Sequence, residues 1–287
     1  MSSSLPFRIL NVFACAGDPF SGNPLCVFED GRDLSDATMQ ALARQFNLSE
    51  TTFILPASSD GATARVRIFT PSFEMPFAGH PTLGTAHVVR ALRSGGDRVV
   101  LEMKAGLVEV AAEKDAWTLR AAYEPRTRKP DASRADIAAM LGLPESAIAG
   151  QPLWVDTGAM QLVIPLATVD DVRRMTPDAV LLARHGSAAG REEPMAYVWA
   201  PAGQGEVLTR FVFVVHGGVV EDPATGSACA NLGGWMLATG APLPVSLKVS
   251  QGEAVKRPSR LGLQVDAQRH VFVRGDVVEL GRGTITL

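Results

Sequence analysis

Two similar segments, separated by about half of the 287-residue chain, constrain the fold more than any other feature of the sequence. The first reads Pro76-Phe-Ala-Gly-His-Pro-Thr-Leu-Gly-Thr, and the second reads Glu221-Asp-Pro-Ala-Thr-Gly-Ser-Ala. When Gly79-His80 is aligned on Gly226-Ser227, a helix rich in Ala, Gly and Leu follows in both copies. The order of the neighbouring parts also recurs, which predicts a chain built twice from the same units.

Each segment predicts a helix whose first turn can receive an anion. Gly79-His80-Pro81 opens a predicted helix that runs to about Arg93, because proline is tolerated where its missing N–H has no intrahelical partner. The second predicted helix runs to about Thr239. Free amides in a first helical turn, together with the positive end of the helix dipole, attract negative charge.

The halves predict an α+β protein with two similar lobes. Residues 1–125 read as a β-rich lobe with two helices, and residues 126–287 repeat that pattern after a connection rich in proline and charge. We expect a curved, mostly antiparallel sheet against one helix in each lobe. Helix starts that face each other would leave a cleft between the lobes, where small-molecule sites often form. The sequence does not decide to which lobe the final strand belongs.

Composition argues against several classes of partner. The formal charge of −3 and the absence of a Lys or Arg run give no support for nucleic acid. No apolar stretch approaches the roughly 20 residues of a membrane span, and the first residues do not resemble a signal peptide, so we expect a cytoplasmic protein. The three cysteines and five histidines lack metal-ligand spacing, so we expect no metal site and no disulfide framework.

Three side chains are candidates for chemistry, each with a structural alternative. Glu50 lies between two apolar stretches, where burial would raise its pKa toward the range useful for proton transfer, but it could also end the preceding helix. His80 could hydrogen-bond a bound carboxylate or act as an acid, or it could be structural. Asp222 could hold an amine or relay a proton, or it could belong to an ordinary turn.

The glycines and Ser227 also allow two interpretations. Gly79, Gly226 and Gly84 would let a backbone approach a ligand closely, or they would permit tight helix packing. Ser227 does not lie in a Gly-x-Ser-x-Gly motif, so a nucleophilic serine has no support. No Gly-x-Gly-x-x-Gly joins a strand to a helix, so a dinucleotide cofactor is not expected.

Taken together, the motifs resemble the PhzF-like phenazine-biosynthesis isomerase family over nearly the whole chain. This resemblance implies the diaminopimelate-epimerase fold, in which each of two lobes is a β-barrel-like sheet around a central helix, related by a pseudo-two-fold axis. It also implies a homodimer and cofactor-independent isomerisation, as in the rearrangement of trans-2,3-dihydro-3-hydroxyanthranilate. The motifs that carry it are Asn11-Val-Phe, Ser21-Gly-Asn-Pro, Asn47-Leu-Ser-Glu-Thr, Ile68-Phe-Thr-Pro, the two segments above, Gln251-Gly and Gly281-Arg-Gly-Thr.

The resemblance further implies a role for each candidate residue. Glu50 would be the general acid/base that removes a proton from one carbon and returns it to another. His80 and Asp222 would orient and polarise the polar groups of the substrate. The substrate-binding donors to its carboxylate would be Gly79, Gly226 and Ser227.

A racemase or epimerase of an amino or hydroxy acid is the alternative enzyme, and a non-catalytic ligand-binding homologue is the third reading. Racemases of this fold use two opposed cysteines, but the aligned positions here hold Ala78 and Thr225, and we expect Cys229 to be packed. One carboxylate acting on a single face is therefore favoured. The chain departs from the family pattern at residues 159–161 and 211–216 and at Lys256, which bears on the identity of the substrate.

Overall fold

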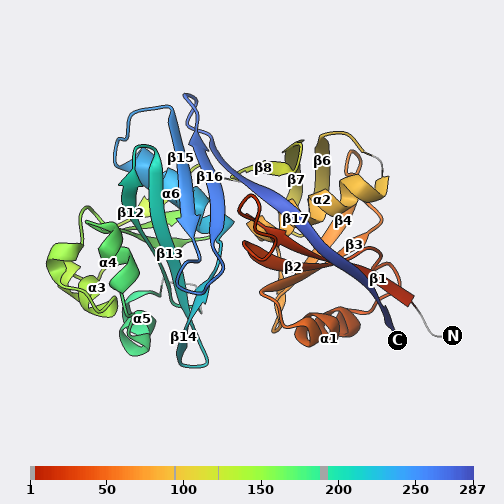
Figure 1. The fold of residues 1–287 in the computed structure, drawn as a ribbon, viewed down its shortest axis with the longest axis horizontal. Helices are drawn as coiled ribbons and strands as arrows, with labels where there is room; N and C mark the ends of the chain where they lie inside the picture. Colours follow the sequence, from red (N-terminus) through yellow and green to blue (C-terminus); the bar gives the residue numbers. More distant parts are fainter. Residues whose placement is uncertain (1–3, 94, 122, 188–192) are drawn as a thin grey trace. The chain divides into compact units, whose positions relative to one another are not determined.

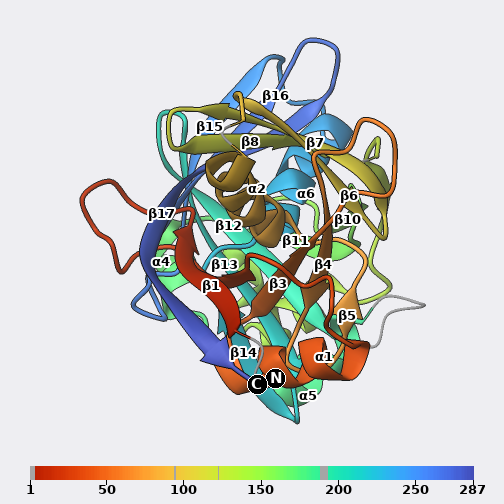
Figure 2. The same ribbon diagram turned by 90° about the vertical axis from the view of Figure 1, so that its right-hand side faces the viewer.

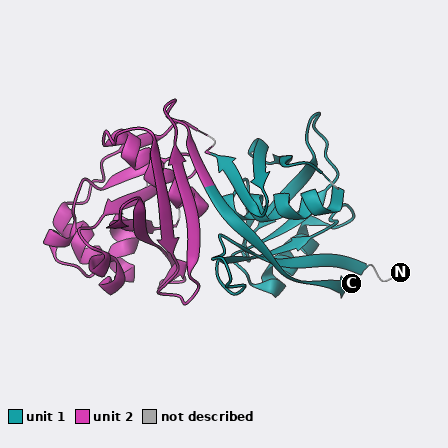
Figure 3. Ribbon diagram, turned by 45° about the horizontal axis from the view of Figure 1, so that its top comes forward, with its two compact units in different colours: residues 1–120, 274–287 teal, residues 121–273 magenta. Residues whose placement is uncertain are grey.

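In this computed structural model the described residues are 4–93, 95–121, 123–187 and 193–287. The chain divides into two compact units (Figure 3). Unit 1 comprises residues 1–120 and 274–287, and unit 2 comprises residues 121–273. The sequence predicted a division at residue 125 and left the lobe of the final strand undecided. In the structure residues 274–287 belong to unit 1, because the last strand pairs with the first.

The described part of unit 1 contains two helices, α1 and α2. Most of its strands are neighbours in the sheet in the order in which they follow one another along the chain. Helix α1 is amphipathic and begins at Asp36 after the capping residue Ser35, whose side chain accepts a hydrogen bond from the amide of Thr38. The elements are β1 (Ser4–Val12), β2 (Asn23–Phe28), α1 (Asp36–Phe46), β3 (Glu50–Leu55), β4 (Ala64–Phe69), β5 (Glu74–Met75), α2 (Gly79–Arg93), β6 (Arg98–Met103), β7 (Gly106–Glu113), β8 (Ala116–Arg120) and the end of β17 (Val271–Thr286).

In the described part of unit 1, eight strands close into a ring. The order around the ring is β17–β1–β2–β3–β4–β6–β7–β8, and β8 pairs again with β17. The β2–β3 and β4–β6 pairs are parallel, and the other pairs with a described register are antiparallel. Helix α2 contacts seven of these strands (Figure 2). The unit is thus a closed barrel around a central helix.

Gly84 allows α2 to pack closely against this barrel. A Cβ atom at Gly84 would lie 2.5 Å from Leu25 Cδ2 and 2.9 Å from Val12 Cγ2. Such distances are far inside van der Waals contact, so a larger residue would push the helix away from β1 and β2. The packing interpretation of Gly84 is therefore the one that the structure supports.

Unit 2 has more helices, and most of them lie together on one side of its strands (Figure 1). Its sheet has the order β9–β10–β11–β12–β13–β15–β16, with β14 paired to the far end of β13. The elements are β9 (Arg126–Arg128), α3 (Arg134–Met140), a 3₁₀ turn (Glu145–Ala147), β10 (Leu153–Asp156), β11 (Gln161–Pro165), α4 (Val169–Arg174), α5 (Ala179–His185), β12 (Met195–Gly203), β13 (Glu206–Val215), β14 (Gly218–Asp222), α6 (Gly226–Ala238), β15 (Val245–Gln251) and β16 (Ser259–Val265).

The connectivity of unit 1 recurs in unit 2. The parallel pair β2–β3 corresponds to the parallel pair β11–β12, and β4–β6 corresponds to β13–β15. In each unit an antiparallel hairpin, β4–β5 or β13–β14, leads directly into the Gly-rich helix, α2 or α6. The α+β class and the internal repeat agree with the expectation from the sequence.

Candidate active site

Glu50 and His80 meet at the start of α2 in unit 1. Glu50 is the first residue of β3, and His80 is the second residue of α2. The Nδ1 atom of His80 lies 3.5 Å from Oε2 of Glu50, whose side chain is 15% exposed. A buried hydrogen bond of 2.8 Å between the hydroxyls of Thr52 and Thr85 also joins β3 to α2. The fold therefore brings together two of the predicted catalytic residues.

Glu50 does not end the helix before it. Helix α1 ends at Phe46, and Asn47 caps it in the left-handed conformation with φ of 52°. The amide of Asn47 donates to the carbonyl of Ala43. Since another residue terminates the helix, the structural alternative for Glu50 loses its basis.

His80 is neutral at ordinary pH because it is buried. Desolvation lowers the pKa of His80 to about 3, and a hydrogen bond to the carbonyl of Pro24 only partly opposes this shift. Near neutral pH the imidazole therefore donates and accepts hydrogen bonds without carrying a charge. It can orient a polar group beside Glu50, but it does not form a charged ion pair with the carboxylate.

The segment that presents the Pro24 carbonyl is held by buried polar residues. The hydroxyl of Ser21 accepts a hydrogen bond from the amide of Cys15 at 2.7 Å and donates to the carbonyl of Asp18 at 2.6 Å. The side-chain amide of Asn11 donates to the carbonyl of Pro19 at 2.6 Å. These bonds fix the approach of the chain to β2, and hence the partner of His80.

Asp222 lies in a hydrogen-bonded group at the start of α6 in unit 2. It is the last residue of β14, and its Oδ2 accepts a 2.5 Å hydrogen bond from the hydroxyl of Thr225. The side-chain amide nitrogen of Gln251 donates to the carbonyl of Asp222 at 2.8 Å and to the hydroxyl of Thr225 at 3.0 Å. Thr225 thus holds the carboxylate of Asp222 directly, while Gln251 holds the Asp222 backbone and Thr225, which goes beyond an ordinary Asp-Pro turn.

This arrangement leaves the first turn of α6 without a side-chain cap. Thr225 occupies the N-cap position but forms no side-chain capping hydrogen bond; its hydroxyl donates to Asp222 and accepts from Gln251. The helix begins with Gly226 and Ser227, whose amides point out of the first turn. These amides lie at the positive end of the helix dipole and suit a carboxylate.

Ser227 takes part in a second group of polar side chains in unit 2. Its hydroxyl accepts a 3.0 Å hydrogen bond from the side-chain amide of Gln161, the first residue of β11. Gln161 is in turn bonded to Asn231 of α6 at 2.8 Å. The predicted site residues therefore fall into one set in unit 1, with Gly79, His80 and Glu50, and one in unit 2, with Asp222, Gly226 and Ser227.

Gln161, Asn231 and Gln251 were not predicted from the sequence. All three side chains are buried, and a buried amide almost always has hydrogen-bond partners. Asn231 stands within the otherwise apolar run Ala228 to Leu237, which is the signal that could have drawn attention to it.

The cysteines do not supply a racemase-type pair of bases. Cys229 is fully buried within α6, and burial raises the pKa of its thiol. Burial raises the pKa of Cys26 as well. The packed environment expected for Cys229 is confirmed. Among the described residues, no group of three or more His, Cys, Asp and Glu side chains is arranged to hold a metal ion, and no helix is long and apolar enough to cross a membrane.

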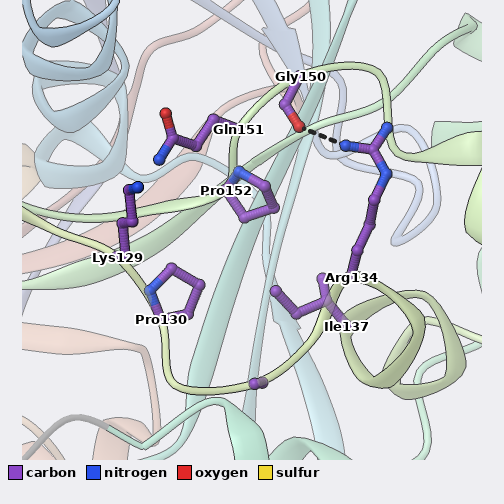
Figure 4. A pocket seen from close by; sticks show the side chains of 8 residues that line it. Lys129, Pro130, Arg134, Ile137, Gly150, Gln151 and Pro152 are labelled. Atoms are coloured by element: carbon purple, nitrogen blue, oxygen red, sulfur yellow. Dashed lines mark hydrogen bonds between the residues drawn. The ribbon is translucent and has the colours of Figure 1, made fainter.

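A separate pocket of about 330 Å³ lies in unit 2 beside the start of α3 (Figure 4). The guanidinium of Arg134 donates a 3.0 Å hydrogen bond to the carbonyl of Gly150 at its edge. None of the predicted site residues lines it. The lining residues are Lys129, Pro130, Ala132, Arg134, Ile137, Gly150, Gln151 and Pro152.

Comparison with known proteins decides the family. Residues 11–283 match the PhzC-PhzF family, described as phenazine biosynthesis-like protein. The chain belongs to this family. A PhzF family protein of Bacillus anthracis has a similar solved structure, with a TM-score of 0.84 and 21% identity over 99% of this chain and 100% of that one. At this identity the likeness concerns the fold alone.

Two relatives of this chain are named as isomerases. An uncharacterised isomerase of Pasteurella multocida is 36% identical over 99% of this chain and 95% of its own length. The trans-2,3-dihydro-3-hydroxyanthranilate isomerase of Pseudomonas aeruginosa is 37% identical over 88% of each chain. The chain is accordingly an isomerase of the PhzF family, whose members act on small molecules.

Proposed function

We propose that this chain is a cofactor-independent isomerase in which Glu50 moves a proton between two carbons of a small carboxylate-bearing metabolite. The observation that carries the proposal is the pair formed by Glu50 and the neutral His80 at the start of α2, 3.5 Å apart. The relatives named as trans-2,3-dihydro-3-hydroxyanthranilate isomerases support that compound, or one of similar chemistry, as the substrate.

In the proposed reaction the carboxylate of Glu50 takes a proton from a substrate carbon, and the C–H electron pair enters the conjugated system. The carboxylic acid formed on Glu50 then delivers the proton to another carbon on the same face, so that only the double bonds have moved. His80 and Asp222 orient and polarise the polar groups of the substrate. Hydrogen-bond donors of Gly79, Gly226 and Ser227 hold its carboxylate.

The direct test compares Glu50→Gln with wild type in deuterated water, with trans-2,3-dihydro-3-hydroxyanthranilate as substrate. Glutamine keeps the size of the side chain but cannot accept and return the proton, so we expect kcat to fall by at least about 100-fold. Glu145→Gln, at an exposed position in unit 2, is the matched control and should keep wild-type turnover. Unchanged turnover in Glu50→Gln would reject Glu50 as the acid/base.

The same experiment separates the alternatives. Deuterium at a new ring carbon supports isomerisation, whereas inversion at a stereocentre would support an epimerase. Binding of the substrate without any deuterium exchange would support a ligand-binding protein that has lost catalysis.

Two further proposals concern the oligomeric state and the cellular location of the enzyme. We propose a homodimer, which the resemblance to the family supports, and a cytoplasmic location, which the unremarkable composition supports. A light-scattering mass near that of one chain, 30.4 kDa, would contradict the homodimer. Fractionation of the source cells tests the location.

A further inference from the structure

Backbone groups determine which atoms donate and which atoms accept in the hydrogen bonds around Ser227. They do so by fixing the orientation of the Asn231 side chain. Its Oδ1 accepts hydrogen bonds from the amide of Thr157 at 3.0 Å and from the hydroxyl of Thr157 at 2.7 Å. Its Nδ2 donates to the carbonyl of Ala159 at 2.7 Å. A backbone amide can only donate and a carbonyl can only accept, so the orientation of the Asn231 carboxamide follows from its neighbours.

The orientation of Asn231 determines that of Gln161. The Nδ2 of Asn231 also donates to Oε1 of Gln161 at 2.8 Å, so the amide nitrogen of Gln161 must face the other way. That nitrogen donates to the hydroxyl oxygen of Ser227 at 3.0 Å. Gln161 and Asn231 are both buried, so water does not compete for these bonds.

The direction of this chain of hydrogen bonds leaves the Ser227 hydroxyl as a donor. Among the described residues, the Ser227 side chain forms one hydrogen bond, in which its hydroxyl oxygen accepts from Gln161. Its own proton is therefore directed away from Gln161. Ser227 is partly exposed at the first turn of α6, where the amides of the helix start also donate.

We propose that Asn231 and Gln161 are positioning residues that set Ser227 as a hydrogen-bond donor to the substrate carboxylate. This inference rests on the proposed function, since it deepens the role of Ser227 in that site. Ser227 and Asn231 are four residues apart and lie on the same face of α6, and Gln161 reaches both of them from the start of β11. Gln161 and the Ala159 carbonyl, which both accept hydrogen bonds from Asn231, lie in the segment 159–161, where this chain departs from the family pattern.

The test is a double-mutant cycle on ligand affinity. Gln161→Met keeps the length of the side chain but removes its hydrogen bonds, and Ser227→Ala removes the donor. Gln264→Met, at an exposed position of β16, is the matched control. The probes are 3-hydroxyanthranilate, the aromatic counterpart of the proposed substrate, and its carboxamide, with dissociation constants measured by calorimetry.

We expect Ser227→Ala to weaken binding of the carboxylate probe by about 10-fold or more, because a hydrogen bond to a charged group is lost. Gln161→Met should weaken it several-fold, and should add almost nothing when Ser227 is already alanine. Both variants should affect the carboxamide probe less. In turnover, Gln161→Met should raise KM and leave kcat near the wild-type value.

Three results would overturn the inference. They are unchanged affinity in Gln161→Met, an undiminished effect of this substitution in the Ser227→Ala background, and no measurable binding of the carboxylate probe by wild type. Thermal unfolding of each variant shows whether it is folded, and Gln161→Glu gives a second, isosteric variant. Its carboxylate can only accept from Ser227, so it should also weaken carboxylate binding. Failure of the proposed function would instead appear as a lack of turnover in wild type with this cycle intact.

Discussion

At the scale of one residue, burial determines the protonation state of His80. The sequence left open whether His80 acts as an acid, binds a carboxylate or is structural, and burial lowers the pKa of its imidazole to about 3. The side chain therefore stays neutral while it lies 3.5 Å from Glu50. A neutral imidazole leaves Glu50 free to change its own protonation state without an opposing fixed charge.

The lowered pKa of His80 predicts a loss of stability in acid. The unfolded state binds a proton at His80 near pH 6.5, whereas the folded state does not bind it until about pH 3. Between these limits the unfolded state holds more protons, so the free energy of unfolding falls as the pH falls. This residue contributes a slope of about 1.4 kcal/mol per pH unit. His80→Asn should remove that slope in urea unfolding between pH 4 and pH 6. An equal slope in the variant would contradict the prediction.

The candidate residues were easier to identify in the sequence than the side chains that hold them in place. Glu50 was singled out because it lies between two apolar stretches, and His80 because it lies at a predicted helix start; the resemblance to the family then assigned both to one site. The amides of Gln161, Asn231 and Gln251 were missed because their partners come from distant parts of the chain. The bonds of Asn231 to Thr157 and Gln161, for example, join residues 74 and 70 positions apart. No local pattern encodes such a pairing.

At the scale of elements, an arginine–glutamate pair braces the hairpin before each Gly-rich helix. In unit 1, Arg67 of β4 bonds to both carboxylate oxygens of Glu74 at 2.8 and 2.9 Å. In unit 2, Arg210 of β13 bonds to Glu221 of β14 through two nitrogens at 3.0 and 2.8 Å. Each glutamate lies shortly before the start of α2 or α6, so the pair holds the chain as it enters the helix.

Loss of the second pair should destabilise the fold. The Arg210 and Glu221 side chains are only 14% and 7% exposed. Glu221→Gln leaves a buried guanidinium without its counter-charge, and we expect the free energy of unfolding to fall by about 3 kcal/mol. Glu206→Gln, which removes an exposed pair with Lys248, is the control and should cost less than about 1 kcal/mol. Urea unfolding measures both, and equal effects would show that the buried pair does not brace the hairpin.

The sequence predicted most elements but missed the hairpin strand that carries Asp222. The sequence predicts strands over residues 153–156 and 161–165, and β10 and β11 have these limits. Helix α2 also has its predicted limits, because in all three elements the apolar pattern is regular and turn residues bound it. Strand β14 was not predicted. It follows a tight turn in which His216 and Gly217 have φ of 50° and 77°, and a histidine is not a usual signal for such a turn.

At the scale of the whole molecule, β17 determines how the chain is divided. The sequence predicts two strands here, over residues 270–273 and 276–287, but the structure has one strand from Val271 to Thr286. A Cβ at Gly275 would lie 2.1 Å from the ring of Phe13, so this glycine permits a close approach rather than a break. Because the strand continues, it can pair with both β1 and β8 and close the ring of unit 1.

A proline in β17 should therefore open unit 1 selectively. The amide of Val277 donates a 3.0 Å hydrogen bond to the carbonyl of Asp115, and Val277 is also paired with Val12 of β1. Val277→Pro removes that donor from a strand with neighbours on both sides. Hydrogen exchange should show faster exchange in β1 and α2, while α6 of unit 2 keeps its protection. Val277→Ala, which keeps the amide, should produce a smaller change. If α6 lost as much protection as α2, residues 274–287 would stabilise the whole chain and not unit 1 in particular.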